Sequence, residues 1–242
     1  MAALINNSTK ASSVAIVSTL SSPSFAVGGN NRVLYVGVLS GAGSPVDPSG
    51  VKWGGSGGVA LTQVGTTLSV GSFWKFSLWR LIAPTAQTST VYVSWASTQE
   101  EVLLIAVATE DTDQTTPNNT VASGIFNNSV TPSKTATSVS GDLVLDFCAI
   151  AEEDGVSATI SATAGQASLQ EIEGSTTVYE TFGASTKTAS GTTTTMGWTG
   201  TAATTHAYNG QFAFALNGAA ASPTFPPVPT PINPYLSLIS HT

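Results

Sequence analysis

The chain has 242 residues, of which 41% are hydrophobic and only 9% are charged, and its formal net charge is −7. This hydrophobic content is too high for a disordered chain, and the length suits one all-β domain with a buried core. The seven Lys and Arg residues form no cluster, and Cys148 is the single cysteine. Nucleic-acid binding and a disulfide-stapled scaffold are therefore not expected.

Short apolar or alternating runs, bounded by Gly, Ser, Asn and Pro, recur from the N-terminus onwards. β-Branched and aromatic residues fill these runs, which is typical of strands in all-β domains. They predict strands over residues 13–19, 32–39, 60–64, 72–82, 89–95, 101–109, 142–151, 157–162, 168–173, 176–183, 193–198 and 208–217. No run approaches the roughly 18 apolar residues of a membrane span, so membrane insertion is not expected. The N-terminal sequence MAALINNSTK also lacks the basic and apolar regions of a secretory signal.

Two kinds of strand are expected. The runs VLYVGVL (33–39) and VLLIAV (102–107) are almost wholly apolar, which indicates central strands covered on both faces. The runs VYVSW and QFAFAL alternate, which indicates strands with one inner face. Their inward residues would be Val91, Val93 and Trp95, then Phe212, Phe214 and Leu216. Together these strands predict two packed antiparallel sheets over residues 13–217, preceded by an N-terminal segment at 1–12.

The last stretch, SPTFPPVPTPINPYLSLISHT (222–242), contains six of the 12 prolines. Closely spaced prolines favour an extended polyproline II conformation, so residues 218–242 are predicted to form a semi-rigid arm. The arm could dock on a neighbouring subunit or be a frayed tail, and docking better explains its apolar tip. The predicted docking residues are Phe225, Pro227, Pro229, Pro231, Pro234, Tyr235, Leu236, Leu238 and Ile239.

Four motifs in a fixed order carry a family resemblance: GGVALTQVG (57–65), LWRLIAPTAQTSTVYVSW (78–95), EDTDQTTP (110–117) and SGDLVLDFCAI (140–150). With the terminal NGQFAFAL strand, they resemble a β-sandwich module of phage structural proteins and bacterial surface proteins. The resemblance covers residues 13–217 and implies a jelly-roll sandwich, similar to concanavalin-type lectins. It also implies a virion or cell-surface setting, and the proline-rich arm lies outside it.

These observations predict a non-enzymatic virion structural protein, made in the host cytoplasm and exposed on the particle surface. It would be a capsid decoration or cement protein, or a tail accessory protein, whose arm docks on capsid or tail subunits. A closed homo-oligomer such as a trimer is expected, and no cofactor. A secreted or cell-surface location is the alternative.

A second hypothesis is a carbohydrate-binding or host-receptor-binding module. Exposed aromatic rings stack on sugars, and Trp53 and Trp198 are predicted to be exposed because Gly and Thr flank them. Trp74, Trp79 and Trp95 are instead predicted to lie in the core. Host glycans would be the partners of such a surface.

Acidic residues suggest two further sites, and for each the alternative is that the residues simply lie on the solvated surface. Glu110, Asp111 and Asp113 could offer oxygen ligands to calcium, but their spacing lacks the glycine and distal glutamate of an EF-hand loop, so no metal is predicted. Glu171 and Glu173 share one strand face and resemble part of the carboxylate pattern of retaining β-glucanases, but the next carboxylate of that pattern is missing. A β-glucan hydrolase is therefore the third and least favoured hypothesis.

The remaining chemistry-bearing residues predict structural roles. Asp146 interrupts an apolar strand, and if it is buried it must be hydrogen-bonded or paired, with Arg32 or Arg80 as candidate partners. The histidines, His206 and His241, suggest neither a Ser-His-Asp triad nor a zinc site.

Overall fold

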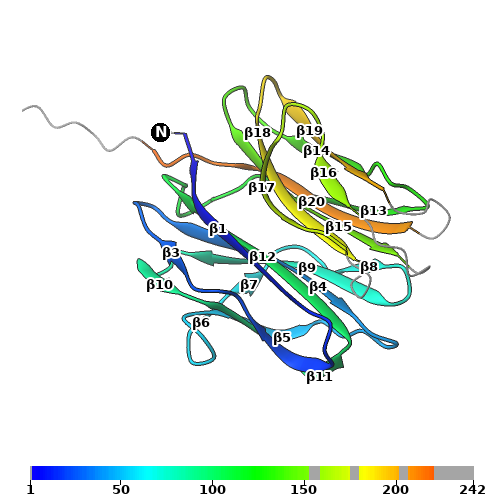
Figure 1. The fold of residues 1–242 in the computed structure, drawn as a ribbon. Coiled ribbons are helices and arrows are strands. Elements are labelled where there is room, and N and C mark those ends of the chain that lie inside the picture. Colours follow the sequence, from blue (N-terminus) through cyan, green and yellow to red (C-terminus); the bar gives the residue numbers. More distant parts are fainter. Residues whose placement is uncertain (1, 153–158, 175–179, 202–206, 221–242) are drawn as a thin grey trace, which may run out of the picture.

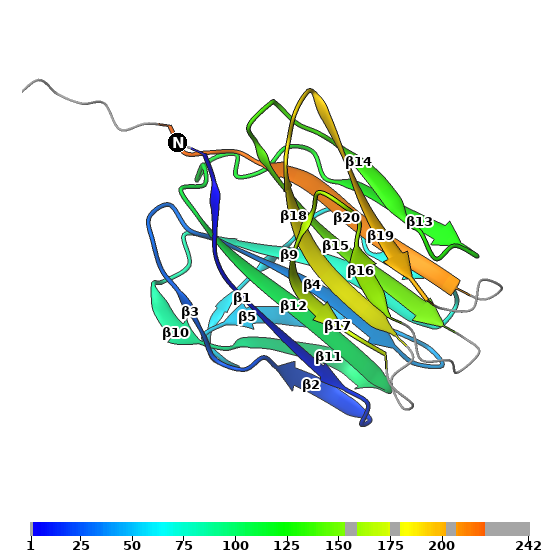
Figure 2. The ribbon, with the colours of Figure 1, turned by 45° about the horizontal axis from the view of Figure 1, so that its top comes forward.

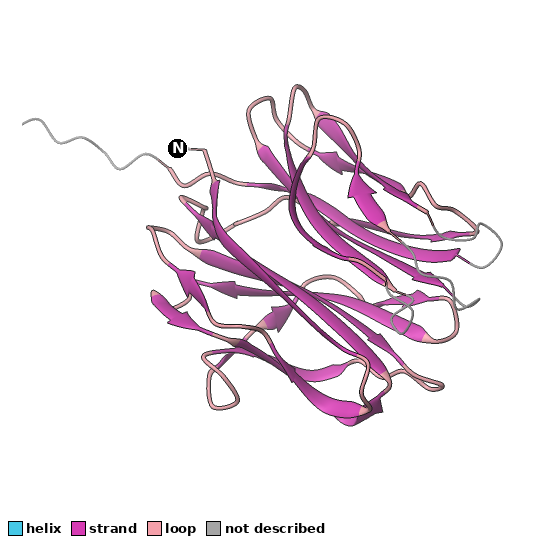
Figure 3. Cartoon of the chain, viewed as in Figure 1, coloured by secondary structure: helices cyan, strands magenta, loops and turns pink. Residues whose placement is uncertain are grey.

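A computed structural model describes residues 2–152, 159–174, 180–201 and 207–220, and every regular element within them is a β-strand (Figures 1 and 3). All the strand pairs are antiparallel, which confirms the predicted all-β antiparallel class. The described part contains no helix that is long and apolar enough to cross a membrane.

The strands are, in chain order, β1 (Leu4–Ser13), β2 (Val17–Ser21), β3 (Phe25–Val27), β4 (Val33–Gly41), β5 (Pro48–Trp53), β6 (Val59–Ala60), β7 (Thr62–Gln63), β8 (Leu68–Val70), β9 (Trp74–Ile82), β10 (Gln87–Ser89), β11 (Val91–Gln99), β12 (Glu101–Glu110), β13 (Ala122–Asn127), β14 (Ser133–Thr137), β15 (Leu143–Glu152), β16 (Ile160–Ala162), β17 (Ala167–Ile172), β18 (Thr181–Thr188), β19 (Thr193–Gly200) and β20 (Ala207–Leu216).

The strands form five sheets where two were predicted, and four of the five are stacked as layers (Figure 2). The first outer sheet has the order β2-β11-β5-β6, and the first inner sheet has the order β1-β12-β4-β9-β7, with β8 also on β9. The second inner sheet has the order β13-β20-β15-β18-β17, and the second outer sheet has the order β14-β19-β16. A small ribbon of β3 and β10 is the fifth sheet.

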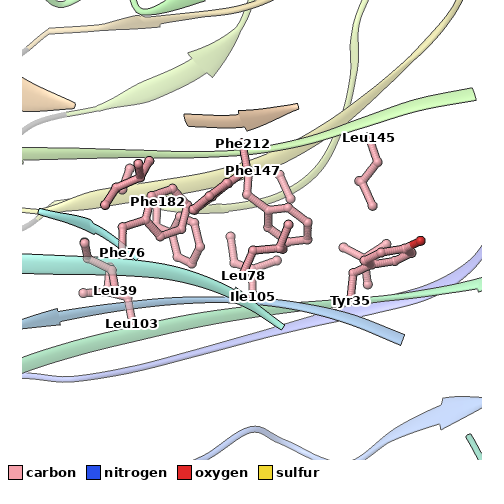
Figure 4. Close-up of a cluster of buried hydrophobic side chains, with 14 of the residues drawn as sticks. Tyr35, Leu39, Phe76, Leu78, Leu103, Ile105, Leu145, Phe147, Phe182 and Phe212 are labelled. Carbon is pink, nitrogen blue, oxygen red and sulfur yellow. The ribbon is translucent and has the colours of Figure 1, made fainter. Parts of the chain in front are cut away.

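Three apolar cores separate the four layers. The largest, the central core, lies between the two inner sheets. In it Phe76 packs edge-to-face against Phe182 and Phe212, with ring centroids 5.3 and 4.8 Å apart (Figure 4). A second core fills the space between the first inner and outer sheets. The third lies between the second inner and outer sheets and includes Trp198 and Met196. Each inner sheet is therefore covered on both faces.

The predicted central strands are confirmed. Successive residues of β4 alternate between two cores, with Tyr35 facing the second half and Leu34 facing the first outer sheet. The prediction of a single inner face is right for β11, whose Val91, Val93 and Trp95 face the second core, but wrong for β20. Ala213 and Ala215 on the other face of β20 pack against the second outer sheet, because small residues let that sheet approach closely.

The two halves of the chain have the same strand order. The strands of the second half, β13–β20, can be numbered one to eight along the chain. Its inner sheet then has the spatial order 1-8-3-6-5, and its outer sheet has the order 2-7-4. The first half repeats this order when β1, β2, β4, β5, β9, β11 and β12 are matched with β13, β14, β15, β16, β18, β19 and β20. The two inner sheets face each other with their strand orders reversed. The first strand of the first half, β1, lies against β17 at the far edge of the other sheet, and β8 lies against β13 and β20. Two copies of one unit placed face to face about a two-fold axis would have this arrangement.

The predicted N-terminal segment, residues 1–12, is part of this fold from Ala3 onwards. From Leu4 onwards it forms β1, which pairs with β12 along its whole length, and Ala3 lies in the central core. The sandwich therefore extends from β1 to Leu216, the last residue of β20.

Candidate functional site

The C-terminal end of the described chain leaves the fold at a fixed point. The connection between the halves runs beside the end of β20, where Thr112 pairs with Gly218 and Asn118 with Leu216. The Ala219 N–H donates to the Asp111 carbonyl at 2.7 Å, close to the start of β1. Both ends of the described chain therefore lie at the same end of the molecule (Figure 2). The predicted docking residues, from Phe225 to Ile239, lie outside the described residues.

The EDTDQTTP motif forms a loop in the connection between the halves. The Asp113 carboxylate accepts hydrogen bonds from the Thr115 and Thr116 N–H groups at 2.7 and 2.8 Å, and these bonds lower the pKa of Asp113. Asp111 has a positive φ of 52° and donates its N–H to the Asn30 carbonyl. The described residues contain no group of three or more His, Cys, Asp or Glu side chains placed to hold a metal ion, so Glu110, Asp111 and Asp113 do not converge.

Asn118 holds this connection against the first inner sheet. Its Oδ1 accepts hydrogen bonds from the Tyr35 hydroxyl at 3.0 Å and from Arg80 Nη1 at 2.7 Å. Burial raises the pKa of Tyr35, although Arg80 opposes the rise. The contact fixes the place where the chain passes from one half to the other.

The predicted exposure of Trp53 and Trp198 is wrong, because their side chains are 1% and 0% exposed. Trp53 packs edge-to-face on Phe25, with ring centroids 5.1 Å apart. Trp198 lies against Gly183, where an added Cβ would fall 2.4 Å from the ring. Gly183 makes room for the buried ring of Trp198, and in their described positions neither Trp53 nor Trp198 can stack on a sugar.

The other tryptophans follow the prediction. Trp74, Trp79 and Trp95 are all buried. Trp74 and Trp79 lie in different cores, because an odd number of positions separates them along β9 and successive residues of a strand point to opposite faces.

Asp146 is the centre of a buried polar cluster in the third core. Its Oδ1 accepts hydrogen bonds from the Ser185 N–H and Oγ at 3.2 and 2.6 Å. Its Oδ2 accepts from Trp198 Nε1 at 2.6 Å and from Gln211 Nε2 at 2.8 Å. Burial raises the pKa of Asp146 to about 6, although all of these donors oppose the rise. Asp146 is buried, and the prediction that a buried Asp146 must be hydrogen-bonded is confirmed.

The predicted arginine partners of Asp146 are wrong. Arg32 donates to the Pro84 and Gly29 carbonyls, and Arg80 donates to Asn118. Uncharged donors from β18, β19 and β20 hold the Asp146 carboxylate, and sequence reasoning missed them. The one available signal was Gln211, a polar residue within the apolar run of β20.

Gln166 extends the cluster towards the surface. Its Nε2 donates to Ser185 Oγ at 2.7 Å, and its Oε1 accepts from the Gly197 N–H at 2.6 Å and from Thr163 Oγ1 at 3.0 Å. The turn before β17 thereby contacts β18 and β19. Cys148 lies beside this cluster, where burial and the nearby Asp146 raise the pKa of its thiol.

The predicted pair Glu171 and Glu173 lies on and just after the edge strand β17, with Ile172 between them pointing into the central core. Their shared strand face is therefore the one turned away from that core. Glu180 is buried separately, where its Oε1 accepts a hydrogen bond from Trp74 Nε1 at 2.6 Å. His206 and His241 lie outside the described residues.

Comparisons of the chain with protein-family models, with curated proteins and with solved structures gave no match.

Proposed function

We propose that the protein is a non-enzymatic structural protein of a phage virion, a capsid decoration or cement protein or a tail accessory protein, which docks through residues 222–242. The observation that carries the proposal is that the residues just before this segment are held in place by hydrogen bonds to the fold. Ala219 is bonded to Asp111 at the end where β1 begins. The apolar tip of the segment then follows six prolines. Such a segment can bind a neighbouring capsid or tail subunit while the sandwich remains on the particle surface.

The strand order supports a jelly-roll type for each half. In that fold the strands alternate between two sheets, so that the first pairs with the last and the second with the one before the last. The pairs β1–β12 and β13–β20, and β2–β11 and β14–β19, have this relation. The resemblance to the phage and bacterial surface module is part of the same proposal.

A deletion of residues 222–242 tests the docking role. Removal should leave the near-ultraviolet circular dichroism and the melting temperature of the sandwich unchanged, and should abolish cosedimentation with particles of the phage that encodes the protein. A sharper variant replaces Tyr235, Leu236, Leu238 and Ile239 with serine and keeps every proline. Its matched control is Val139→Ser, which removes an exposed apolar side chain of the sandwich. Full particle binding by the deletion protein would refute the proposal.

The carbohydrate-binding or receptor-binding alternative stays a prediction, but it can no longer rest on Trp53 and Trp198, which are buried. Binding of the intact protein to a glycan array would support it. The third hypothesis, a β-glucan hydrolase, also stays a prediction, and turnover of β-glucans that is lost in Glu171→Gln would support it.

A further inference from the structure

Three side chains form one hydrogen-bonded line from the edge of the second half into its interior. Gln166 Nε2 donates to Ser185 Oγ at 2.7 Å, and Ser185 Oγ donates to Asp146 Oδ1 at 2.6 Å. Ser185 and Asp146 are both fully buried. A hydroxyl therefore lies between a carboxylate and a carboxamide, in a place that bulk water does not reach.

The Gln166 carboxamide is held as an electrophile. Its Oε1 accepts hydrogen bonds from the Gly197 backbone N–H at 2.6 Å and from Thr163 Oγ1 at 3.0 Å. Two donors on a carbonyl oxygen draw electrons from the carbonyl carbon and stabilise the negative charge that develops there during acyl transfer. The carbon Cδ is bonded to Nε2, so it lies within about 4 Å of Ser185 Oγ.

Asp146 is placed as the base for Ser185. Trp198 and Gln211 hold its Oδ2, so its Oδ1 is directed at the serine hydroxyl. A carboxyl whose pKa is raised by burial is a better proton acceptor near neutral pH than an exposed one. The Thr163 hydroxyl already donates to Oε1 and is placed as a donor, not as the nucleophile.

We propose that Ser185 and Gln166 form an intramolecular ester. Asp146 accepts the proton of the Ser185 hydroxyl, and the oxygen attacks Gln166 Cδ, with the Gly197 N–H and Thr163 Oγ1 donating to the oxyanion. The C–N bond to Nε2 then breaks as Asp146 returns the proton to the departing nitrogen. The products are one ester bond and one molecule of ammonia, and Asp146 is again ionised.

The ester would join β18 covalently to the turn before β17. It would thereby tie the edge of the second inner sheet to its interior without a disulfide. This inference does not depend on the proposed virion role, because it concerns one reaction within the chain.

Intact-mass spectrometry of the full chain tests the proposal. The protein should be about 17 Da lighter than its sequence, the mass of one ammonia, and a digest should contain one peptide that joins Gln166 to Ser185. Alkaline hydroxylamine, which cleaves esters, should separate the two parts of that peptide. A protein of full sequence mass, or a loss that fragment ions place elsewhere, would overturn the proposal.

Two variants and one control sharpen the test. Ser185→Ala removes the nucleophile and Gln166→Glu removes the leaving amine, so both should have the full sequence mass. Ser138→Ala removes another buried serine of the same half and should keep the mass loss. If Ser185→Ala keeps the mass loss, the proposal is wrong. If Ser185→Ala or Gln166→Glu fails to fold, the hydroxylamine result on the unmutated protein decides.

Discussion

The packing of Gly183 against Trp198 gives a quantitative prediction for the third core. In Gly183→Ala the added carbon would lie 2.4 Å from Trp198 Cη2, more than an ångström inside an ordinary carbon–carbon contact. The ring cannot move away freely, because its Nε1 donates to the buried Asp146 at 2.6 Å. Overpacking of this kind costs about 1–3 kcal/mol, and loss of a hydrogen bond to a charged group costs about 1.5–3 kcal/mol. The substitution also restricts the unfolded chain, which offsets about 0.4–1 kcal/mol. We therefore expect Gly183→Ala to lower the free energy of unfolding by about 3 kcal/mol.

Urea denaturation of Gly183→Ala and of the unmutated protein measures this difference as a shift of the midpoint at constant slope. Gly191→Ala is the matched control, because nothing lies within 4 Å of a Cβ added there. In a Trp198→Phe background the smaller ring should relieve the clash, so the cost of Gly183→Ala should fall by at least about 1 kcal/mol. A Gly183→Ala protein as stable as the Gly191→Ala control would refute the reasoning that Trp198 is rigidly held.

Two further predictions concern stability. Because burial raises the folded-state pKa of Asp146 from 3.8 to about 6, its contribution to stability is complete below about pH 4 and falls as the pH rises to 6, by on the order of 3 kcal/mol. Urea denaturation between pH 4 and 7 should show this decline in the unmutated protein and not in Asp146→Asn; a flat profile in both would contradict it. Phe182→Ala should cost about 3–5 kcal/mol by opening a cavity between the inner sheets, whereas Ile16→Ala, at a side chain that is 70% exposed, should change the melting temperature little. Equal effects of these two substitutions would argue against the packing of the inner sheets.

The sequence predicts the class of the fold well because its strands obey simple periodicity. A wholly apolar run such as β4 must have both faces covered, and it does. Periodicity could not give the number of layers, because Ala213 and Ala215 in β20 suit either a solvent-facing surface or a close contact with another sheet. The repeated strand order was equally hidden, since it is set by pairings such as β1 with β12 and not by similar residues.

For the polar cluster, the sequence predicts that Asp146 needs partners but not which ones. Ser185, Trp198 and Gln211 lie 39, 52 and 65 residues away along the chain, and only the packing of the second outer sheet on the second inner sheet brings them together. Trp198 was misjudged for a related reason. Its neighbours Gly197 and Thr199 are typical of a loop, whereas the glycine that makes room for its ring, Gly183, lies on β18, which is distant in the sequence.

The position of the chain ends has a mechanical consequence. The N-terminal end of β1 meets the C-terminal end of β12, and the C-terminal end of β20 lies beside the same residues. Force applied between the two ends would therefore peel β1 and β20 away from their neighbours one hydrogen bond at a time. Such unzipping needs much less load than sliding whole strands past one another, so the sandwich would resist tension better when it is pulled lengthwise along its strands from opposite ends than from its termini.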